Sequence, residues 1–427
     1  MKQAMINGER LLRRLDDFAM IGGTPAGGVN RQALSAEDRI ARRELAMLAM
    51  KRGFTVFQDP LANLFIRRDG GRSDDPPFLI GSHLDSQPTG GRFDGALGTL
   101  AAFEVLEALD DAGIETDLPI EVVAWTNEEG SRFAPGTMGS MAFAAGAISP
   151  GWSDLRGQDG ALFPDELKAT LEALPEAEMR PLGFPVSGYL EVHIEQGPSL
   201  EKEGIPIGIV TGIQGTRWLE VTITGQAAHA GTTALSYRRD PMRAAVSVMD
   251  ELFRNIMPAD ERARFTVGRF SLEPGSVNAI PGEVKFTIDL RHPETVQLDA
   301  FESMIQKICV STAETAGCLV NIRRFFDMPP AVFSKPILDA LERAAKHAGL
   351  STKPILSGAF HDALFVNRVA PAAMIFVPCR DGLSHNEAEY VEPEHTIIGA
   401  QMLLASTLEA MSTVAAERTS QNSEIVR

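Results

Sequence analysis

Cysteine is scarce in this chain of 427 residues, which contains only three. Cys309, Cys318 and Cys379 have no CxxC spacing, and their number is odd. A disulfide framework is therefore not expected, and the cysteine usage is typical of a reducing, cytoplasmic compartment. If a metal ion is bound, its main ligands are expected to come from other residue types.

Long apolar runs and clusters of positive charge are also missing. No uninterrupted apolar run approaches the roughly 20 residues of a membrane span. Residues 1–23 alternate charged and apolar positions, without the apolar core of a secretory signal. The formal net charge of −17 is unfavourable for binding nucleic acid or an anionic membrane surface. We therefore expect a soluble globular protein with no nucleic-acid or membrane partner.

Alternating strand and helix patterns at both ends of the chain predict an α/β fold with a mostly parallel, mixed sheet flanked by helices. Apolar strands precede polar loops, and amphipathic or apolar helices follow them. The segments that carry this pattern are PPFLIGSHLD (76–85), ALGTLAAFEVLEALDDAG (96–113), LPIEVVAWTNEEG (118–130), LDALERAAKHAG (338–349), AAMIFVP (372–378) and EHTIIGAQMLLASTLEAM (394–411).

The middle of the chain has a different pattern. Between residues 213 and 329 the order strand, helix, hairpin, helix, strand predicts an α+β layer with helices on one face of an antiparallel sheet. We therefore predict a catalytic domain in two parts, 1–212 and 330–427, with the domain 213–329 inserted between them.

The stretch GSHLDSQPTGGRFDGALG (81–98) places His83, Asp85 and Asp94 among five glycines, directly after a buried strand. Glu128 and Glu129 follow another strand in the same way. In parallel sheets the ligand site lies beyond the carboxyl ends of the strands. We therefore expect these polar side chains to lie near one another.

Two further histidines follow strand patterns. His193 lies in YLEVHIEQGP, and His385 lies in DGLSHNEAEY after the strand AAMIFVP. Imidazole and carboxylate groups are ligands of zinc and similar ions, and a pair of ions needs a bridging carboxylate. A single histidine at a strand end is more often a hydrogen-bonded surface residue, and an aspartate in a glycine-rich loop usually supports the turn. Their joint occurrence at several strand ends favours a metal site.

Seven motifs occur together and in order: HLDSQPTGGRFDGALG, TNEEGSRF, HIEQGP, GQAAHAGTT, SVNAIPG, DLRHP and SHNEAEY. From about residue 10 to 415 the sequence resembles the dinuclear metal amidohydrolases of the M20 peptidase group. Within that group it is most similar to the branch of N-carbamoyl-L-amino acid hydrolases, β-ureidopropionase and allantoate amidohydrolase. The resemblance implies a zinc-exopeptidase-like sheet, an inserted lid and dimerisation domain, and a homodimer.

The resemblance also implies a role for each residue that matches a motif. Two divalent ions are implied, zinc first, with manganese, cobalt or nickel as alternatives. Glu128 would be the general base, and Asp85 would orient the His83 ring by a hydrogen bond. The implied ligands are His83 and His193 for the first metal, Glu129 and His385 for the second, and Asp94 as the bridge between them.

Further matches concern the substrate. His229 in the HAGTT motif would reach across a dimer to polarise the substrate carbonyl, and Asn278 and Arg291 would hold the substrate carboxylate. Phe360 departs from the family pattern, in which a small residue is frequent, and would narrow the pocket near His361. Weaker matches to substrate-pocket positions are Gln196, Gln214, Arg217 and Gly358. The histidines interpreted as structural are His292, His347 and His395.

The implied substrate is an N-carbamoyl amino acid or a related ureido acid that carries a carboxylate. Hydrolysis of its C–N bond would release an amine, ammonia and carbon dioxide. The alternatives are allantoate or another ureide, a dipeptide or acylated amino acid as for an M20 aminoacylase or dipeptidase, and a catalytically silent ligand-binding homologue. All ligand positions and the base are present, which disfavours the silent homologue.

Overall fold

The computed structural model describes residues 4–425, and contacts divide the chain into two compact units. Unit 1 comprises residues 1–211 and 333–427, and unit 2 comprises residues 212–332. The predicted insertion, 213–329, lies within unit 2.

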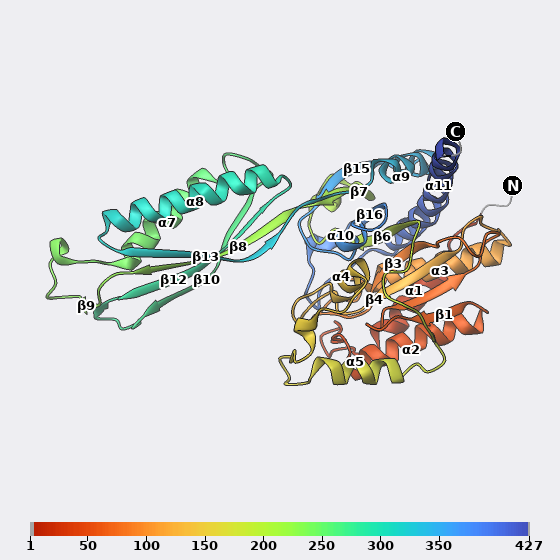
Figure 1. Ribbon diagram of the computed structural model, residues 1–427, viewed down its shortest axis with the longest axis horizontal. Coiled ribbons are helices and arrows are strands. Elements are labelled where there is room, and N and C mark those ends of the chain that lie inside the picture. Colours follow the sequence, from red (N-terminus) through yellow and green to blue (C-terminus); the bar gives the residue numbers. More distant parts are fainter. Residues whose placement is uncertain (1–3, 426–427) are drawn as a thin grey trace. The chain divides into compact units, whose positions relative to one another are not determined.

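The main sheet is mixed, with the strand order β14-β7-β16-β6-β3-β4-β2-β1-β5 and with β15 beside β7. Figure 1 labels its central strands β4, β3, β6 and β16. Its strands are β1 (Thr55–Gln58), β2 (Leu64–Arg68), β3 (Phe78–His83), β4 (Ile120–Trp125), β5 (Glu178–Met179), β6 (Gly188–Ile194), β7 (Ile207–Ile213), β14 (Ala331–Val332), β15 (Thr352–Ser357) and β16 (Ala372–Val377).

Four parallel neighbours, β4, β3, β6 and β16, form the centre of this sheet. Every residue of these four strands is buried. Strands that are covered on both faces are continuously apolar rather than alternating, which explains why runs such as FLI and MIF could be recognised in the sequence. The predicted α/β class with a parallel sheet centre is confirmed.

Helices flank the sheet, and α3 begins directly after the glycine-rich stretch. Its N-cap is Gly95, and it ends at Gly113 in the left-handed conformation, as the sequence predicted. It packs on β3, β4 and β6. The helices of this part are α1 (Gly8–Ala19), α2 (Ala36–Lys51), α3 (Ala96–Ala112), α4 (Met138–Ala145), η1 (Pro150–Trp152), α5 (Phe163–Glu172), α6 (Ser199–Glu203), α9 (Lys335–Ala348), α10 (Ala363–Val366), η3 (Arg380–Gly382) and α11 (Pro393–Ile425).

The helix α11 is longer than the sequence predicted. By length and composition, its segment Pro393–Ala416 could cross a membrane, and 56% of that apolar window is buried inside the protein. It packs against α3, α9, β6 and β16, as a core helix of a globular protein does. Polar residues such as Gln401 and Ser406 interrupt its apolar positions, so no continuous run is visible in the sequence.

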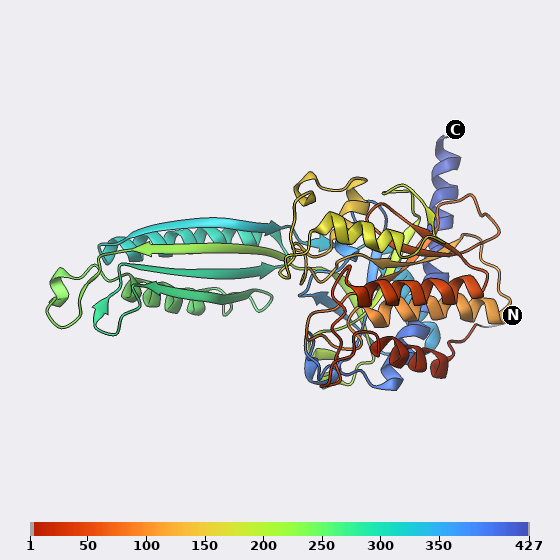
Figure 2. The same cartoon turned by 90° about the horizontal axis from the view of Figure 1, so that it is seen from below.

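Unit 2 contains a four-stranded antiparallel sheet in the order β10-β12-β8-β13, with α7 and α8 on one face (Figures 1 and 2). Alternate residues of β8, Leu219, Val221 and Ile223, are fully buried in the core beneath the helices. The predicted α+β layer is confirmed. Its elements are β8 (Gly215–Thr224), β9 (Ala228–His229), η2 (Leu235–Tyr237), α7 (Pro241–Asn255), β10 (Arg264–Glu273), β11 (Ala279–Ile280), β12 (Glu283–His292), α8 (Thr295–Thr315) and β13 (Leu319–Met328).

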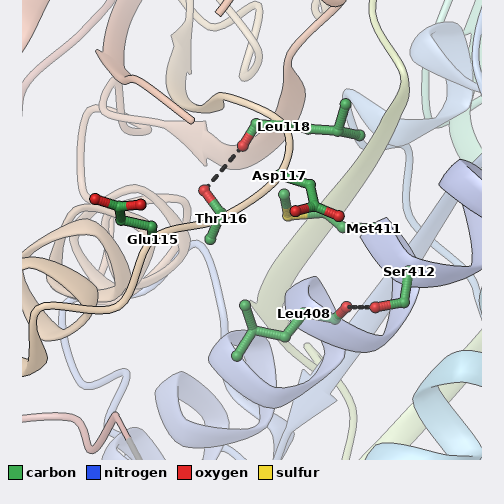
Figure 3. Close-up of a pocket in the computed structure, with 7 residues that line it drawn as sticks. All are labelled: Glu115, Thr116, Asp117, Leu118, Leu408, Met411 and Ser412. Carbon is green, nitrogen blue, oxygen red and sulfur yellow. Dashed lines mark hydrogen bonds between the residues drawn. The ribbon is translucent and has the colours of Figure 1, made fainter. Parts of the chain in front are cut away.

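A pocket of about 200 Å³ lies between the loop 115–118 and α11 (Figure 3). Its two hydroxyl groups are already engaged, because Thr116 donates to the carbonyl of Leu118 and Ser412 donates to the carbonyl of Leu408. Glu115 and Asp117 also line this pocket.

Candidate metal centre and active site

The chemistry-bearing side chains of unit 1 come from the carboxyl ends of the four central strands. His83 is the last residue of β3, and His193 lies one residue before the end of β6. Glu128 and Glu129 follow β4, and His385 lies in the loop after β16. Because these strands are parallel neighbours, their ends meet at one edge of the sheet.

The first cluster contains His83, Asp94 and His193, which offer ligand atoms within 4.8 Å of one another. The Asp94 Oδ1 lies 3.1 Å from the His193 Nε2 and 3.7 Å from the His83 Nε2. Each Nδ1 contacts a backbone carbonyl, that of Asp85 at 2.9 Å and that of Ile194 at 3.0 Å. An Nδ1–H donor leaves the lone pair on Nε2, and both buried Nε2 atoms make no hydrogen bond.

The second cluster contains Asp94, Glu129 and His385. The His385 Nε2 lies 3.3 Å from the Glu129 Oε2 and 3.6 Å from the Asp94 Oδ2. The other oxygen of Glu129 is buried and has no hydrogen-bond partner. Asp94 therefore presents one oxygen to each cluster. Unsatisfied nitrogen and oxygen atoms arranged in this way fit two divalent cations that share a carboxylate.

Glu128 lies beside the first cluster, with its Oε2 at 3.6 Å from the His83 Nε2. Burial raises its pKa well above the ordinary value, and the carboxylates of Asp362 and Glu129 raise it further. Burial and the Asp94 carboxylate raise the pKa of Glu129 in the same direction. Buried carboxylates that lie close together repel one another, which disfavours their ionisation. Bound cations would relieve this repulsion.

The histidines of the first cluster differ in their electrostatics. Burial lowers the pKa of His83 to about 4, because neighbouring charges do not compensate for lost hydration. Burial also opposes protonation of His193, but the Asp94 and Glu191 carboxylates outweigh it and raise that pKa to about 9. Without a metal, the proton on His193 is the positive partner of the Asp94 carboxylate. A cation bound in the first cluster would replace that proton.

Asp85 contacts His83 through its backbone carbonyl, while its carboxylate lies 3.9 Å from the His83 Nδ1. The carboxylate instead accepts the backbone N–H groups of Glu128 at 3.3 Å and Glu129 at 3.2 Å. Asp85 was expected to orient His83, and the structure shows a different task for its side chain. The carboxylate fixes the loop that carries the two glutamates.

Two glycines of the stretch 81–98 are required by close approaches. A Cβ on Gly95, which has φ +64°, would lie 2.3 Å from the His83 imidazole. A Cβ on Gly91 would lie 2.1 Å from the Glu389 Oε1. Since real Cβ contacts are never this short, any side chain at these positions would displace His83 or Glu389.

Glu191, a buried residue near the site, was missed in the sequence, and His361 was named only as a neighbour of Phe360. Glu191 and His361 form a third group with His193, and the His361 ring lies edge-on to the His193 ring at 4.5 Å. Glu191 already accepts hydrogen bonds from the hydroxyls of Ser82 and Tyr189, at 2.7 and 3.1 Å, so it supports His193 rather than offering a free ligand. The signal was present, because Glu191 precedes His193 by two residues on one strand and therefore shares its face.

The weaker substrate matches in unit 1 differ in position. Gln196 belongs to the metal cluster, since its Nε2 donates to the Asp94 Oδ2 at 2.9 Å and to the Ser384 Oγ at 3.1 Å. Gly358 is exposed and lies in the loop between β15 and the buried His361. Phe360 lies in the same loop and is partly exposed.

In unit 2, His229 and Asn278 lie close together. His229 pairs with Ala279 across β9 and β11, and the backbone N–H of Ala230 donates to the Asn278 carbonyl at 2.9 Å. The exposed His229 ring accepts the backbone N–H groups of Gly231 and Thr232 at its Nδ1. An Nδ1 acceptor places the proton of a neutral ring on Nε2, which makes that atom a hydrogen-bond donor.

Arg291 lies near the other end of unit 2. The strand β12 begins at Glu283, near β11, and Arg291 lies eight residues further along it. At 3.3 Å per residue, Arg291 is about 26 Å from Glu283. Its guanidinium forms two hydrogen bonds with the carboxylate of Asp289, at 2.9 and 2.7 Å. Within one chain, therefore, the structure does not bring Arg291 together with His229 and Asn278.

Arg217 forms ion pairs that the sequence interpretation did not include. Its guanidinium lies on the helix-covered side of β8 and contacts the carboxylates of Asp299, Glu302 and Asp327 at 2.6, 2.9 and 3.3 Å. All three guanidinium nitrogens therefore have acidic partners within unit 2, which favours a structural role, and the substrate contact stays a prediction. Gln214 retains an unpaired acceptor, since its Oε1 is buried without a hydrogen-bond partner.

The remaining histidines have structural or surface positions. His292 is fully buried, with its Nε2 3.0 Å from the Asp260 carboxylate and its Nδ1 accepting the Glu294 N–H. His347 is mostly exposed beside Glu409. His395 lines a pocket of about 280 Å³ with mainly apolar neighbours.

Comparisons with known proteins agree with this architecture. The model of peptidase family M20/M25/M40 matches residues 79–409. An N-carbamoyl-L-amino acid amidohydrolase of Geobacillus stearothermophilus is 39% identical over 93% of this chain and 97% of its own length. A ureidoglycolate hydrolase of Oryza sativa is 30% identical over 93% of this chain and 84% of its own length.

A solved structure has the same fold over almost the whole chain. The hydantoinase/carbamoylase family amidase of Burkholderia multivorans is 42% identical, with a TM-score of 0.90, and the match covers 95% of this chain and 98% of that one. The chain therefore belongs to peptidase family M20/M25/M40 and, within it, to the hydantoinase/carbamoylase family of amidases.

Proposed function

We propose that this chain is a dinuclear metal-dependent amidohydrolase that cleaves the C–N bond of an N-carbamoyl amino acid or a related ureido acid. The observation that carries the proposal is the position of Asp94, which offers one oxygen to each of two ligand clusters at the sheet edge. Relatives named N-carbamoyl-L-amino acid amidohydrolase support the substrate class, because they match this chain over nearly their whole length.

His83 and His193 would hold one cation, Glu129 and His385 would hold the other, and Asp94 would bridge them. Zinc is the first choice for this nitrogen and oxygen ligand set, and manganese, cobalt and nickel also fit. Bound cations would supply a water of lowered pKa and polarise the substrate carbonyl.

Glu128 would be the general base and then the general acid of the reaction. Its carboxylate lies beside the first cluster, where it would accept a proton from the attacking water and later pass that proton to the leaving nitrogen. Hydrolysis of a carbamoyl group in this way consumes one water and yields the amine, ammonia and carbon dioxide.

Residues of unit 2 would bind the substrate. His229 would donate from Nε2 to the developing oxyanion, because its Nδ1 is occupied by two backbone N–H groups. Arg291 would hold the substrate carboxylate with its guanidinium fork, and Asn278 would add a hydrogen bond.

We further propose that unit 2 acts as a lid and dimerisation domain in a cytoplasmic homodimer. Arg291 lies about 26 Å from Glu283, the end of β12 that is near His229, and this separation supports the proposal. Residues at opposite ends of one unit reach the same small substrate only when they come from different subunits. Sedimentation or light scattering would test the dimer, and a monomer with full activity would overturn it.

A panel assay tests the substrate class. Ammonia release is measured with N-carbamoyl-L-amino acids, N-carbamoyl-β-alanine, allantoate, ureidoglycolate and, through amine release, a dipeptide, each with added zinc or manganese. The proposal predicts turnover of at least one N-carbamoyl amino acid. Turnover of the dipeptide alone would favour the aminoacylase or dipeptidase alternative, and turnover of allantoate alone would favour the allantoate alternative. Turnover of ureidoglycolate alone would favour the activity for which the rice relative is named.

A further inference from the structure

Glu389 is a buried carboxylate to which the proposed mechanism gives no role. Its side chain is 2% exposed, and it lies in the loop after β16, four residues beyond His385. Its Oε1 accepts two backbone N–H groups, from Phe93 at 2.9 Å and from Asp94 at 3.0 Å. Hydrogen bonds to an ionisable acceptor are among the stronger ones in proteins, so this carboxyl group holds the backbone of Asp94 firmly.

Ser384 lies between the second oxygen of Glu389 and the side chain of Asp94. The Glu389 Oε2 lies 3.3 Å from the Ser384 Oγ, and the Ser384 hydroxyl donates to the Asp94 Oδ2 at 2.7 Å. Glu389 therefore holds the backbone of Asp94 directly, and the Ser384 hydroxyl, which lies beside Glu389, holds the Asp94 carboxylate. The constrained oxygen, Oδ2, is the one that faces Glu129 and His385.

The close approach of Gly91 to Glu389 indicates that the loop has space for this carboxylate because position 91 has no side chain. A Cβ at Gly91 would lie 2.0 Å from the Glu389 carboxyl carbon, so the glycine is the residue that admits the carboxylate. Nearby, the rings of Phe93 and Tyr390 pack edge to face at 6.0 Å and join the same two loops.

We propose that Glu389 and Ser384 are positioning residues that tie the loop of Asp94 to the loop of His385, and thereby set the geometry of the second cation site. Ligands from two separate loops can share an ion only if the loops are fixed relative to each other. The first site depends less on this tie, because His83 and His193 come from the neighbouring strands β3 and β6. This inference rests on the proposed dinuclear site.

Binding of zinc and manganese to the full-length protein, measured by isothermal titration calorimetry and elemental analysis, tests the inference without any substrate. The variants are E389A, S384A and the conservative E389Q, which keeps an oxygen for the two N–H groups. The matched control is E392A, three residues away in the same segment, whose exposed side chain pairs with Arg380.

We expect E389A and S384A to weaken binding of the second ion by about tenfold or more, as supporting residues around a metal site do, while the first ion stays bound. E389Q is expected to restore much of this affinity, and E392A should resemble wild type. Two ions bound by E389A and S384A with wild-type affinity would overturn the inference. If E389A does not fold, metal binding by S384A tests the inference by itself.

The wild-type protein separates this inference from the proposed function. Two bound ions without hydrolysis of any ureido acid would refute the proposed substrate class and leave the role of Glu389 open to the same titration. Failure of the wild type to bind a second ion would refute the dinuclear site, and the role of Glu389 with it.

Discussion

Replacement of Glu128 by glutamine tests the assignment of the general base. The change keeps the size of the side chain and removes its ability to accept a proton. Burial and the nearby carboxylates of Asp362 and Glu129 already favour an uncharged group at this position. The variant is therefore expected to fold with an unchanged melting temperature.

The expected loss of activity follows from the two uses of Glu128. General acid–base catalysis contributes about 10²–10⁴-fold, and Glu128 would serve both the water and the leaving nitrogen. We expect kcat to fall by about 10³-fold or more, which corresponds to ~4 kcal/mol of transition-state stabilisation. Metal content should stay at the wild-type level, since the two ligand clusters do not include Glu128.

Ammonia release under saturating substrate, together with elemental analysis of the same preparation, measures both quantities. The control is E172Q, which removes a carboxylate from an exposed position on α5. A Glu128→Gln variant with both ions bound and kcat within about tenfold of wild type would refute the assignment. Loss of an ion would instead make Glu128 a ligand.

Four other substitutions have distinct expected outcomes. Asp94→Ala should release at least one metal equivalent, measured by elemental analysis, and unchanged metal content would rule out a bridge. His229→Ala should lower kcat by about 10²–10³-fold with metal retained, because an oxyanion donor is lost; an unaltered kcat would remove it from the mechanism. Arg291→Lys should lower kcat/KM for carboxylate substrates, since lysine lacks the bidentate fork, and an unchanged value would exclude Arg291. Arg217→Met should lower the free energy of unfolding by about 1–2 kcal/mol in denaturant melts, after allowance for solvent screening of its acidic partners; unchanged stability would contradict its structural role.

The proximity of the candidate metal ligands could be predicted because it follows from local patterns. Buried parallel strands are recognisable as apolar runs, and a polar residue directly after such a run lies at the carboxyl edge of the sheet. His83 and Glu128 are of this kind. The strand order still had to come from the structure, since the adjacency of β3 to both β4 and β6 depends on long-range pairing.

The supporting residues could not be predicted in this way. Glu389 contacts Asp94 across 295 positions of sequence, and nothing in the segment NEAEY distinguishes it from a solvated loop glutamate. Asp85 was recognised, but the separate tasks of its carbonyl and its carboxylate are visible only in three dimensions.

Arg217 is a residue for which two signals in the sequence point to different roles. A motif match suggested a substrate contact, but residue parity on β8 places Arg217 on the same face as the buried Leu219, beneath the helices. The alternation of that strand was visible in the sequence and would have favoured a structural role. A strand residue is better assigned from the face it occupies than from its neighbours in a motif.

The number of divalent ions bound per chain tests the central claim most directly. Purified protein is stripped of metal by a chelator, reconstituted with zinc or manganese, and analysed for metal content and ammonia release at each step. We expect two ions per chain and activity that requires both. Full activity with one ion, or with none, would contradict a shared carboxylate at Asp94.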